Sequence, residues 1–213
     1  MFQKISTLII SITFLLLGCG NGTESTLPVL GPFERTADGE KAFYTVRDFR
    51  LLNQEGDTID QKALAGKIRV ADFFFTSCPT ICPQLQSEMI RIREAFAQNK
   101  DVVLLSYTID PKRDSVAHLA KYALNLGVKD AQQWHFLTGN RDSIYTLADD
   151  YFNIAVEDPS APGGFDHSGR ITVVDPAGQI RSIANGLKRQ EVDQLIKDIK
   201  TLIDEINANN TAG

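Results

Sequence analysis

Two cysteines lie close together in the stretch ADFFFTSCPTICPQLQSEM, residues 71–89. Three residues separate Cys78 from Cys82, and Pro83 follows the second cysteine. Because proline is well accommodated at the first helical position, a helix predicted over 83–98 begins just after the pair. Helix N-termini favour anions, so at least one thiol is expected to be acidified and available as the thiolate. Thiolates attack disulfides and bind soft metals, so the pair predicts thiol–disulfide exchange or metal binding.

The same two cysteines could also form a disulfide with each other. Their spacing is compatible with a bridge in a compact turn, and such a bridge forms readily in an exported protein. A bridge that closes so short a loop constrains little of the unfolded chain, so a purely structural disulfide is the less favoured interpretation of Cys78 and Cys82.

A soft-metal site would normally add an imidazole to the two thiolates, and the chain has three histidines. His118 falls among polar residues of a predicted helix, where a solvated side chain is expected. His135 begins a short strand, where a packed side chain is expected. His167 lies in FDHSGRITVVD behind a loop rich in Gly and Pro, and is either an exposed loop residue or the third ligand. Zinc would usually require a fourth ligand, which the sequence does not identify.

Asp72 is unusual because it interrupts the apolar run IRVADFFF six residues before Cys78. Burial without a cationic partner would raise the pKa of Asp72, which suits a general base. In a thiol–disulfide oxidoreductase, Cys78 would then be the nucleophile, Cys82 the resolving thiol and Asp72 the proton acceptor. The alternative is a structural carboxylate that bonds to a neighbouring strand or to a lysine such as Lys67.

The N-terminus has the pattern of an export signal. Lys4 precedes the apolar stretch ISTLIISITFLLLG, which is short for a membrane-spanning helix, and Cys19 follows it. Residues 16–19, LLGC, resemble a bacterial lipobox, in which cleavage leaves the cysteine at the new N-terminus carrying lipid. An ordinary secretory signal with a chance cysteine is the alternative. Lipidation of Cys19 would anchor the chain to the membrane, with its domain in the cell envelope outside the cytoplasm.

Composition indicates a single folded domain. The chain has 213 residues, of which 43% are hydrophobic and 23% are charged, and its net charge is −5. No basic stripe interleaved with aromatic residues is evident, so nucleic-acid binding is not expected. The predicted division is a lipoprotein signal peptide over 1–18, a flexible tether over 19–41 and a folded domain over 42–208.

The elements that must position the candidate side chains alternate between strands and helices. The predicted strands cover 67–75, 102–109, 134–137, 170–174 and 179–183, with a strand or hairpin in 43–52. The predicted helices cover 83–98, 114–125, 142–151 and 188–206, with a loop over 155–165. This order predicts an α/β, thioredoxin-like three-layer fold with a central mixed β-sheet. In open α/β sheets the chemistry lies at the carboxyl ends of strands, where the cysteine pair follows the first long strand.

Four stretches, in order across residues 44 to 200, make the sequence resemble the Sco/SenC family. They are FFFTSCPTICPQL, SYTIDPKRD, WHFLTG and DHSGRITVVDPAGQI. The resemblance implies a thioredoxin-like domain that binds copper, as Cu(I) or Cu(II), through Cys78, Cys82 and His167. Two thiolates and one imidazole suit three-coordinate Cu(I). Both thiols would have to be reduced, so a disulfide between the cysteines would block loading.

The resemblance also implies a role. Family members are expected to be metallochaperones that deliver copper to the binuclear copper centre of cytochrome c oxidase, or that keep the cysteines of this centre reduced. The implied partners are the copper-centre subunit of the oxidase or another copper client, a redox partner for the disulfide, and the membrane. The favoured interpretation is therefore a binding protein and not an enzyme. The alternative is a thiol–disulfide oxidoreductase of the cell envelope that uses the Cys78 and Cys82 pair.

Three features modify this interpretation. Thr80 stands where many relatives carry an acidic residue after the first Cys-Pro. Asp166 could orient His167 through a hydrogen bond. Thioredoxins place a proline directly before the strand that corresponds to ITVVD, whereas this chain has HSGR there, which argues against a thioredoxin-type reductase. A peroxiredoxin-like enzyme fits the two-cysteine turn and remote histidine poorly.

Overall fold

The computed structural model describes residues 26–129 and 131–212, so the predicted signal peptide and Cys19 lie outside the described residues. The strands are β1 (Phe33–Arg35), β2 (Lys41–Phe43), β3 (Arg50–Leu52), β4 (Thr58–Asp60), β5 (Ile68–Phe74), β6 (Val102–Thr108), β7 (Trp134–Leu137), β8 (Ala155–Glu157), β9 (Phe165–His167), β10 (Arg170–Val174) and β11 (Ile180–Asn185). The helices are α1 (Cys82–Ala95), α2 (Val116–Asn125), α3 (Arg141–Asp150) and α4 (Arg189–Ala212), with a 3₁₀ turn at Pro162–Gly164.

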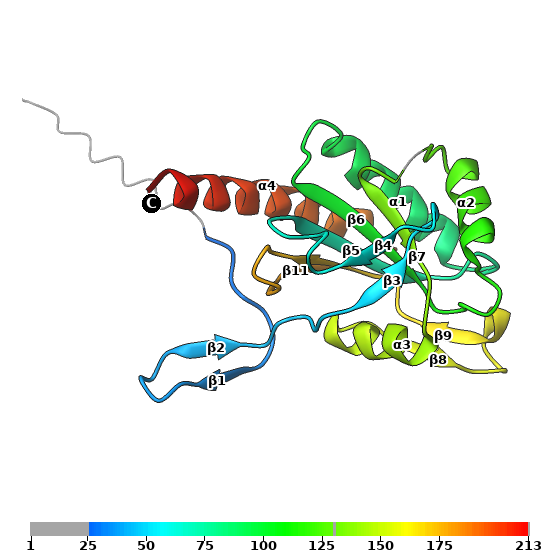
Figure 1. Cartoon of the computed structure of the whole chain (residues 1–213), viewed down its shortest axis with the longest axis horizontal. Helices are drawn as coiled ribbons and strands as arrows, with labels where there is room; N and C mark the ends of the chain where they lie inside the picture. The colour runs from blue at the N-terminus through cyan, green and yellow to red at the C-terminus, as the bar shows by residue number, and fades with distance from the viewer. Residues whose placement is uncertain (1–25, 130, 213) are drawn as a thin grey trace, which may run out of the picture.

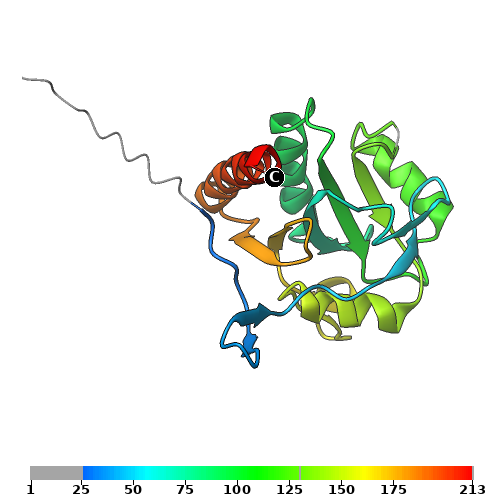
Figure 2. The ribbon, with the colours of Figure 1, turned by 60° about the vertical axis from the view of Figure 1, so that its left-hand side comes forward.

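The central sheet has the strand order β11-β10-β5-β6-β7. Strands β5, β6 and β7 are parallel, whereas β10 is antiparallel to both β5 and β11. Helices α1 and α4 pack together, and α3 lies away from them across the sheet (Figures 1 and 2). The predicted α/β, thioredoxin-like three-layer fold with a central mixed sheet is therefore confirmed.

The apolar run that predicts the first long strand is buried on both faces. Every residue of β5 and of β6 is buried. Because side chains alternate along a strand, Phe73 and Phe74 point to opposite sides of the sheet. Phe73 stacks on Tyr107 at 5.0 Å between ring centroids, and Phe74 lies 5.3 Å from Tyr122 of α2. These aromatic contacts fix the strand whose carboxyl end leads into the cysteine pair.

The structure corrects the predicted loop over 155–165. Within it, β8 pairs with β9 in an antiparallel hairpin, with Ala155 opposite His167 and Glu157 opposite Phe165. The Gly and Pro residues that suggest a loop occupy the connection between the two strands, where Gly163 adopts a φ of 81°. The Gly and Pro residues therefore correctly indicated a turn, but they gave no sign of the short strands on either side of it.

The structure also places ordered elements before residue 42, where the sequence predicts a flexible tether. Leu30 N donates to Ile180 O at 2.8 Å, so this segment bridges to the edge strand β11. Strands β1 and β2 then form a hairpin that projects from the body of the molecule (Figure 1). The contacts that order residues 27–43 come from distant parts of the chain, which local composition does not reveal.

Candidate metal centre

The two cysteines and His167 come together at the carboxyl end of β5. The Nε2 atom of His167 lies 3.6 Å from the Cys78 Sγ atom and 3.4 Å from the Cys82 Sγ atom. One potential ligand atom from each residue falls within 4.8 Å of the others, and both cysteines are free. A metal ion could therefore contact two sulfur atoms and one nitrogen atom with small movements of these side chains.

The cysteines lie in a tight turn that feeds helix α1. Cys78 N donates to Phe75 O at 3.1 Å just after β5, and Ile81 is the N-cap residue of the helix. Cys82 is consequently the first helical residue, and Pro83 occupies the next position, where its missing N–H leaves no helical bond unmade. This is the turn-then-helix arrangement that the position of the proline predicts.

The electrostatics of the pair make the two thiols unequal. The Cys82 thiol donates toward Cys78, and His167 and the backbone N–H groups of Thr80 and Cys82 add further donors, which lowers the pKa of Cys78 to about 3. The same bond and burial raise the pKa of Cys82 above its ordinary value. The acidified thiol that helix geometry predicts is thus Cys78, which precedes the helix, while Cys82 keeps its proton.

His167 is positioned by the β8–β9 hairpin and by an aromatic side chain. The Phe75 ring lies 5.0 Å from the Phe165 ring and 5.2 Å from the His167 ring, meeting the imidazole at 69°. A Cβ atom on Gly163 would lie 2.8 Å from Phe75, so only glycine allows this close approach. Asp166 is exposed and makes no hydrogen bond to His167, so the suggestion that it orients the imidazole finds no support.

The sequence missed Asp114 as a residue that supports the site. Its side chain is fully buried and accepts from Thr76 N at 3.1 Å, Thr76 Oγ1 at 2.5 Å and Thr108 Oγ1 at 2.5 Å. Thr76 lies two residues before Cys78, so Asp114 ties the cysteine turn to the end of β6 and the following loop. The signal was available, because Asp114 ends the stretch SYTIDPKRD, but nothing in the stretch points to Thr76.

Asp72 is completely buried and has no cationic partner. Gln86 Nε2 donates to it at 2.7 Å, and Ser106 Oγ donates at 2.5 Å from the adjacent position on β6. Burial raises the pKa of Asp72 to about 7. Lys67, which the sequence offered as a partner, instead pairs with Asp101. The predicted hydrogen bond between Asp72 and a neighbouring strand is therefore present, with Ser106 of β6 as the donor. A pKa of about 7 also suits a group that transfers protons near neutral pH.

The other two histidines lie outside the cluster. His118 is exposed on α2, as expected of a solvated residue. His135 is buried in β7, where burial lowers its pKa. Thr80, at the position that is acidic in many relatives, places its Oγ1 3.7 Å from the Cys78 Sγ atom. The cysteine turn therefore presents a neutral hydroxyl to the thiolate.

Comparison with known sequences finds close relatives. A family model described as SCO1/SenC matches residues 37–204. The SCO1 protein homolog of Bacillus subtilis is 32% identical over 160 residues, which are 74% of this chain and 82% of the homolog. The SCO2-like protein RP587 of Rickettsia prowazekii is 29% identical over 208 residues, which are 92% of this chain and 98% of that protein.

Solved structures share the fold. A SCO1/SenC family lipoprotein from Bacillus anthracis has a TM-score of 0.67 at 26% identity, over 75% of this chain and 95% of that one. BsSco has a TM-score of 0.65 at 32% identity, over 75% of this chain and 93% of BsSco. It is described as having a disulfide switch and as a member of the Sco family of cytochrome c oxidase assembly proteins. Yeast Sco1 with copper bound has a TM-score of 0.57 at 25% identity, over 73% of this chain and 88% of that one.

Proposed function

The chain belongs to the SCO1/SenC family, and from this premise we propose that it is a copper-binding metallochaperone. The observation that carries the proposal is the meeting of Cys78, Cys82 and His167, whose ligand atoms lie within 4.8 Å of one another. Two thiolate sulfurs and one imidazole nitrogen form a soft donor set that suits Cu(I). Yeast Sco1, a structural relative, has been solved with copper bound.

Loading depends on the protonation and oxidation of the two cysteines. The lowered pKa of Cys78 supplies one thiolate at neutral pH, whereas Cys82 must lose its proton as the metal enters. Oxidation of the Cys78 thiolate and the Cys82 thiol to a disulfide removes two electrons and the one proton on Cys82, and takes away two of the three ligands. A redox partner that reduces the disulfide would therefore restore binding, and the relative BsSco is described as having a disulfide switch.

The proposed client is the copper-centre subunit of cytochrome c oxidase. Support comes from BsSco, described as a member of a family of oxidase assembly proteins. We further propose that Cys19 carries lipid and holds the domain on the membrane outside the cytoplasm, as the lipobox-like sequence predicts. The Bacillus anthracis relative is described as a lipoprotein. Among the described residues, no helix combines the length and hydrophobicity needed to span a bilayer.

The copper site can be tested by anaerobic competition titration of the reduced chain with Cu(I). The wild type should bind one equivalent. His167→Ala removes the only nitrogen ligand of the cluster and should weaken affinity at least about tenfold, which is about 1.4 kcal/mol. His118→Ala, which removes an exposed histidine, should leave affinity unchanged. Equal affinity of the His167→Ala variant and the wild type would contradict the proposed site.

A second function, thiol–disulfide exchange, is favoured by the unequal thiols and by Asp72. Cys78 would attack a client disulfide as the thiolate, Cys82 would resolve the mixed disulfide, and Asp72 would accept the Cys82 proton. Turnover of a disulfide substrate with a thiol reductant supplied should then fall in Asp72→Asn. Absence of turnover in the wild type would exclude this function and leave the copper proposal intact.

A further inference from the structure

The β1–β2 hairpin is an exposed element of the described chain. Both figures of the whole chain show it projecting from the body, on the side where the N-terminal segment leaves (Figures 1 and 2). Every residue of its two strands is exposed except Phe43, which is half-buried. Phe33 retains 43% of its surface in contact with solvent, although it is a large apolar side chain. A single exposed aromatic residue is ordinary, so the arrangement of its neighbours on the hairpin decides what this surface could bind.

The pairing register divides this hairpin into two unlike faces. Phe33 pairs with Phe43 and Arg35 pairs with Lys41, so alternation places these four side chains on one face. Lys41 Nζ lies 4.6 Å from the centre of the Phe33 ring, and the two phenylalanine rings are 5.5 Å apart. Glu34 belongs to the opposite face. The four residues Phe33, Arg35, Lys41 and Phe43, here called the aromatic–basic face, combine two apolar rings with two cations and no carboxylate.

The first root of the hairpin is fixed to the C-terminal part of the domain. Arg181 Nη2 donates to Leu27 O at 2.6 Å and also pairs with Glu205 of α4 at 2.6 Å. Leu30 N bonds to Ile180 O of β11. The chain therefore enters the domain at a defined point beside α4, only a few residues before Phe33.

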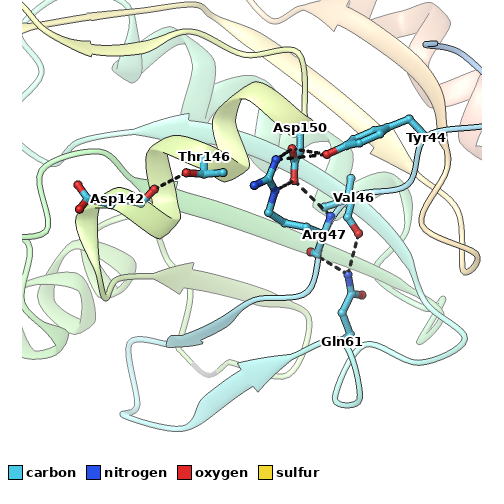
Figure 3. A network of polar contacts seen from close by, with 7 residues as sticks. All are labelled: Tyr44, Val46, Arg47, Gln61, Asp142, Thr146 and Asp150. Carbon is cyan, nitrogen blue, oxygen red and sulfur yellow. Dashed lines mark hydrogen bonds and ion pairs between the residues drawn. The ribbon is translucent and has the colours of Figure 1, made fainter.

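The second root is fixed to helix α3. The buried carboxylate of Asp150 accepts from Arg47 Nε at 2.5 Å, from Arg47 Nη2 at 2.7 Å and from Tyr44 OH at 2.6 Å (Figure 3). Gln61 Nε2 donates to the carbonyl oxygens of Val46 and Arg47. Because both roots are anchored, the hairpin has a defined orientation relative to the body.

The length of chain before the described residues brings a membrane within reach of this face. Seven residue steps connect Cys19 to Thr26, and they span at most roughly 25 Å. We propose that the aromatic–basic face rests on the anionic phospholipid surface of the membrane in which the lipid on Cys19 is inserted. The rings enter the interfacial region and the two cations meet headgroup phosphates. This inference depends on the proposed lipid anchor and not on copper binding.

This contact would give the domain a preferred orientation. Figure 1 shows β9, which ends at His167, at the opposite end of the molecule from the point where the N-terminal segment leaves. With the hairpin on the bilayer, the cluster that contains His167 would lie toward the end of the molecule away from the hairpin. It would then be open to a client that is held above the same membrane.

The experiment is hydrogen–deuterium exchange of the lipidated chain in phosphatidylcholine nanodiscs that contain phosphatidylglycerol, compared with the same chain in detergent. Peptides covering 33–43 should exchange at least about tenfold more slowly in the nanodiscs. Arg35→Glu, which keeps both rings and reverses one charge, should lose most of this protection. Leu124→Ser, which changes an exposed apolar residue of α2 that is 61% exposed, should keep it.

Three results would overturn the proposal. The first is equal exchange of residues 33–43 in nanodiscs and in detergent. The second is an intact mass that shows no lipid on Cys19. The third is protection that rises with protein concentration in the absence of a bilayer, which would assign the face to a second copy of the chain. Copper titration of the same preparations separates these results from failure of the copper proposal, because the hairpin contributes no ligand.

Discussion

Asp72 and Asp114, beneath the metal centre, have different partners from the carboxylates near the entry of the N-terminal segment. Near the entry of the N-terminal segment, Asp150 pairs with Arg47, and both Asp175 and Glu205 pair with Arg181. Beneath the metal centre, Asp72 and Asp114 are completely buried, yet their donors are hydroxyl, amide and backbone N–H groups.

The difference distinguishes a part of the domain that holds the hairpin in place from the part that carries the reactive cysteines. Where each carboxylate has an arginine, the polar groups satisfy one another and hold the hairpin in place. At the metal centre, His167 forms no ion pair with a carboxylate of the described residues. Asp72 accepts hydrogen bonds from Gln86 and Ser106 and has no arginine partner in the described part of the chain. The net charge of the site therefore depends on the protonation of Asp72 and the thiols, and on what the thiols bind.

Asp72→Asn should remove a destabilising pH dependence. The pKa of Asp72 is about 7 in the folded state, above its ordinary value of 3.8, so the folded state binds the proton more tightly than the unfolded state. This group therefore makes stability fall as pH rises from about 4 to about 7, by roughly 4 kcal/mol in total. Relative to the wild type, the variant should gain stability over that range in urea unfolding.

The matched variant at the other end is Asp150→Asn, which removes the partner of Arg47. It should be less stable than the wild type at both ends of the same pH range. If the free energy of unfolding changed with pH in the same way in Asp72→Asn and in the wild type, the raised pKa of Asp72 would be refuted.

Asp114→Asn should weaken the support of the cysteine turn. Three donors point at this carboxylate, and an amide offers only one oxygen to accept them. Unfolding free energy should fall by about 2 to 3 kcal/mol, and Cu(I) affinity should fall with it because Thr76 no longer holds the turn. Asp101→Asn, which changes an exposed ion pair with Lys67, should shift unfolding by less than about 0.5 kcal/mol. An Asp114→Asn variant as stable as Asp101→Asn would show that this support is dispensable.

Gly163→Ala and Gly164→Ala form a pair that separates backbone strain from packing. Both glycines have positive φ, 81° and 87°, so each substitution should cost about 1 kcal/mol in unfolding. Only at Gly163 would the new Cβ meet the Phe75 ring that supports His167. Gly163→Ala should therefore weaken Cu(I) binding a few-fold while Gly164→Ala does not. Equal affinities of the two variants would remove Phe75 from the account of the site.

The sequence predicted much of the fold because its strongest signals are local. The apolar run before Cys78, the proline in the first turn of α1 and the order of strands and helices predict the central sheet and the place of the cysteine pair. The predicted strand over 134–137 coincides with β7. The linkage of His167 to the pair came only from resemblance, because 85 positions separate His167 from Cys82 and no local pattern spans them.

What the sequence did not show depends on contacts between distant segments. The β8–β9 hairpin is hidden by the turn residues that connect its short strands. The order of residues 27–43 depends on Arg181, Glu205 and Asp150, which lie far along the chain. Asp114 likewise acts on a turn 38 positions earlier. Local sequence therefore predicted a loop over 155–165 and a tether before residue 42, and it gave Asp114 no role beyond a turn.

Copper is expected to bind to two sulfur atoms and one nitrogen atom, from Cys78, Cys82 and His167. X-ray absorption spectroscopy of the Cu(I)-loaded chain tests it most directly, with the His167→Ala variant as the reference. The wild type should show two sulfurs and one imidazole nitrogen bound to copper, and the imidazole scattering should be lost in His167→Ala. An imidazole signal that persists in the variant, or wild-type copper without sulfur ligands, would contradict this ligand set.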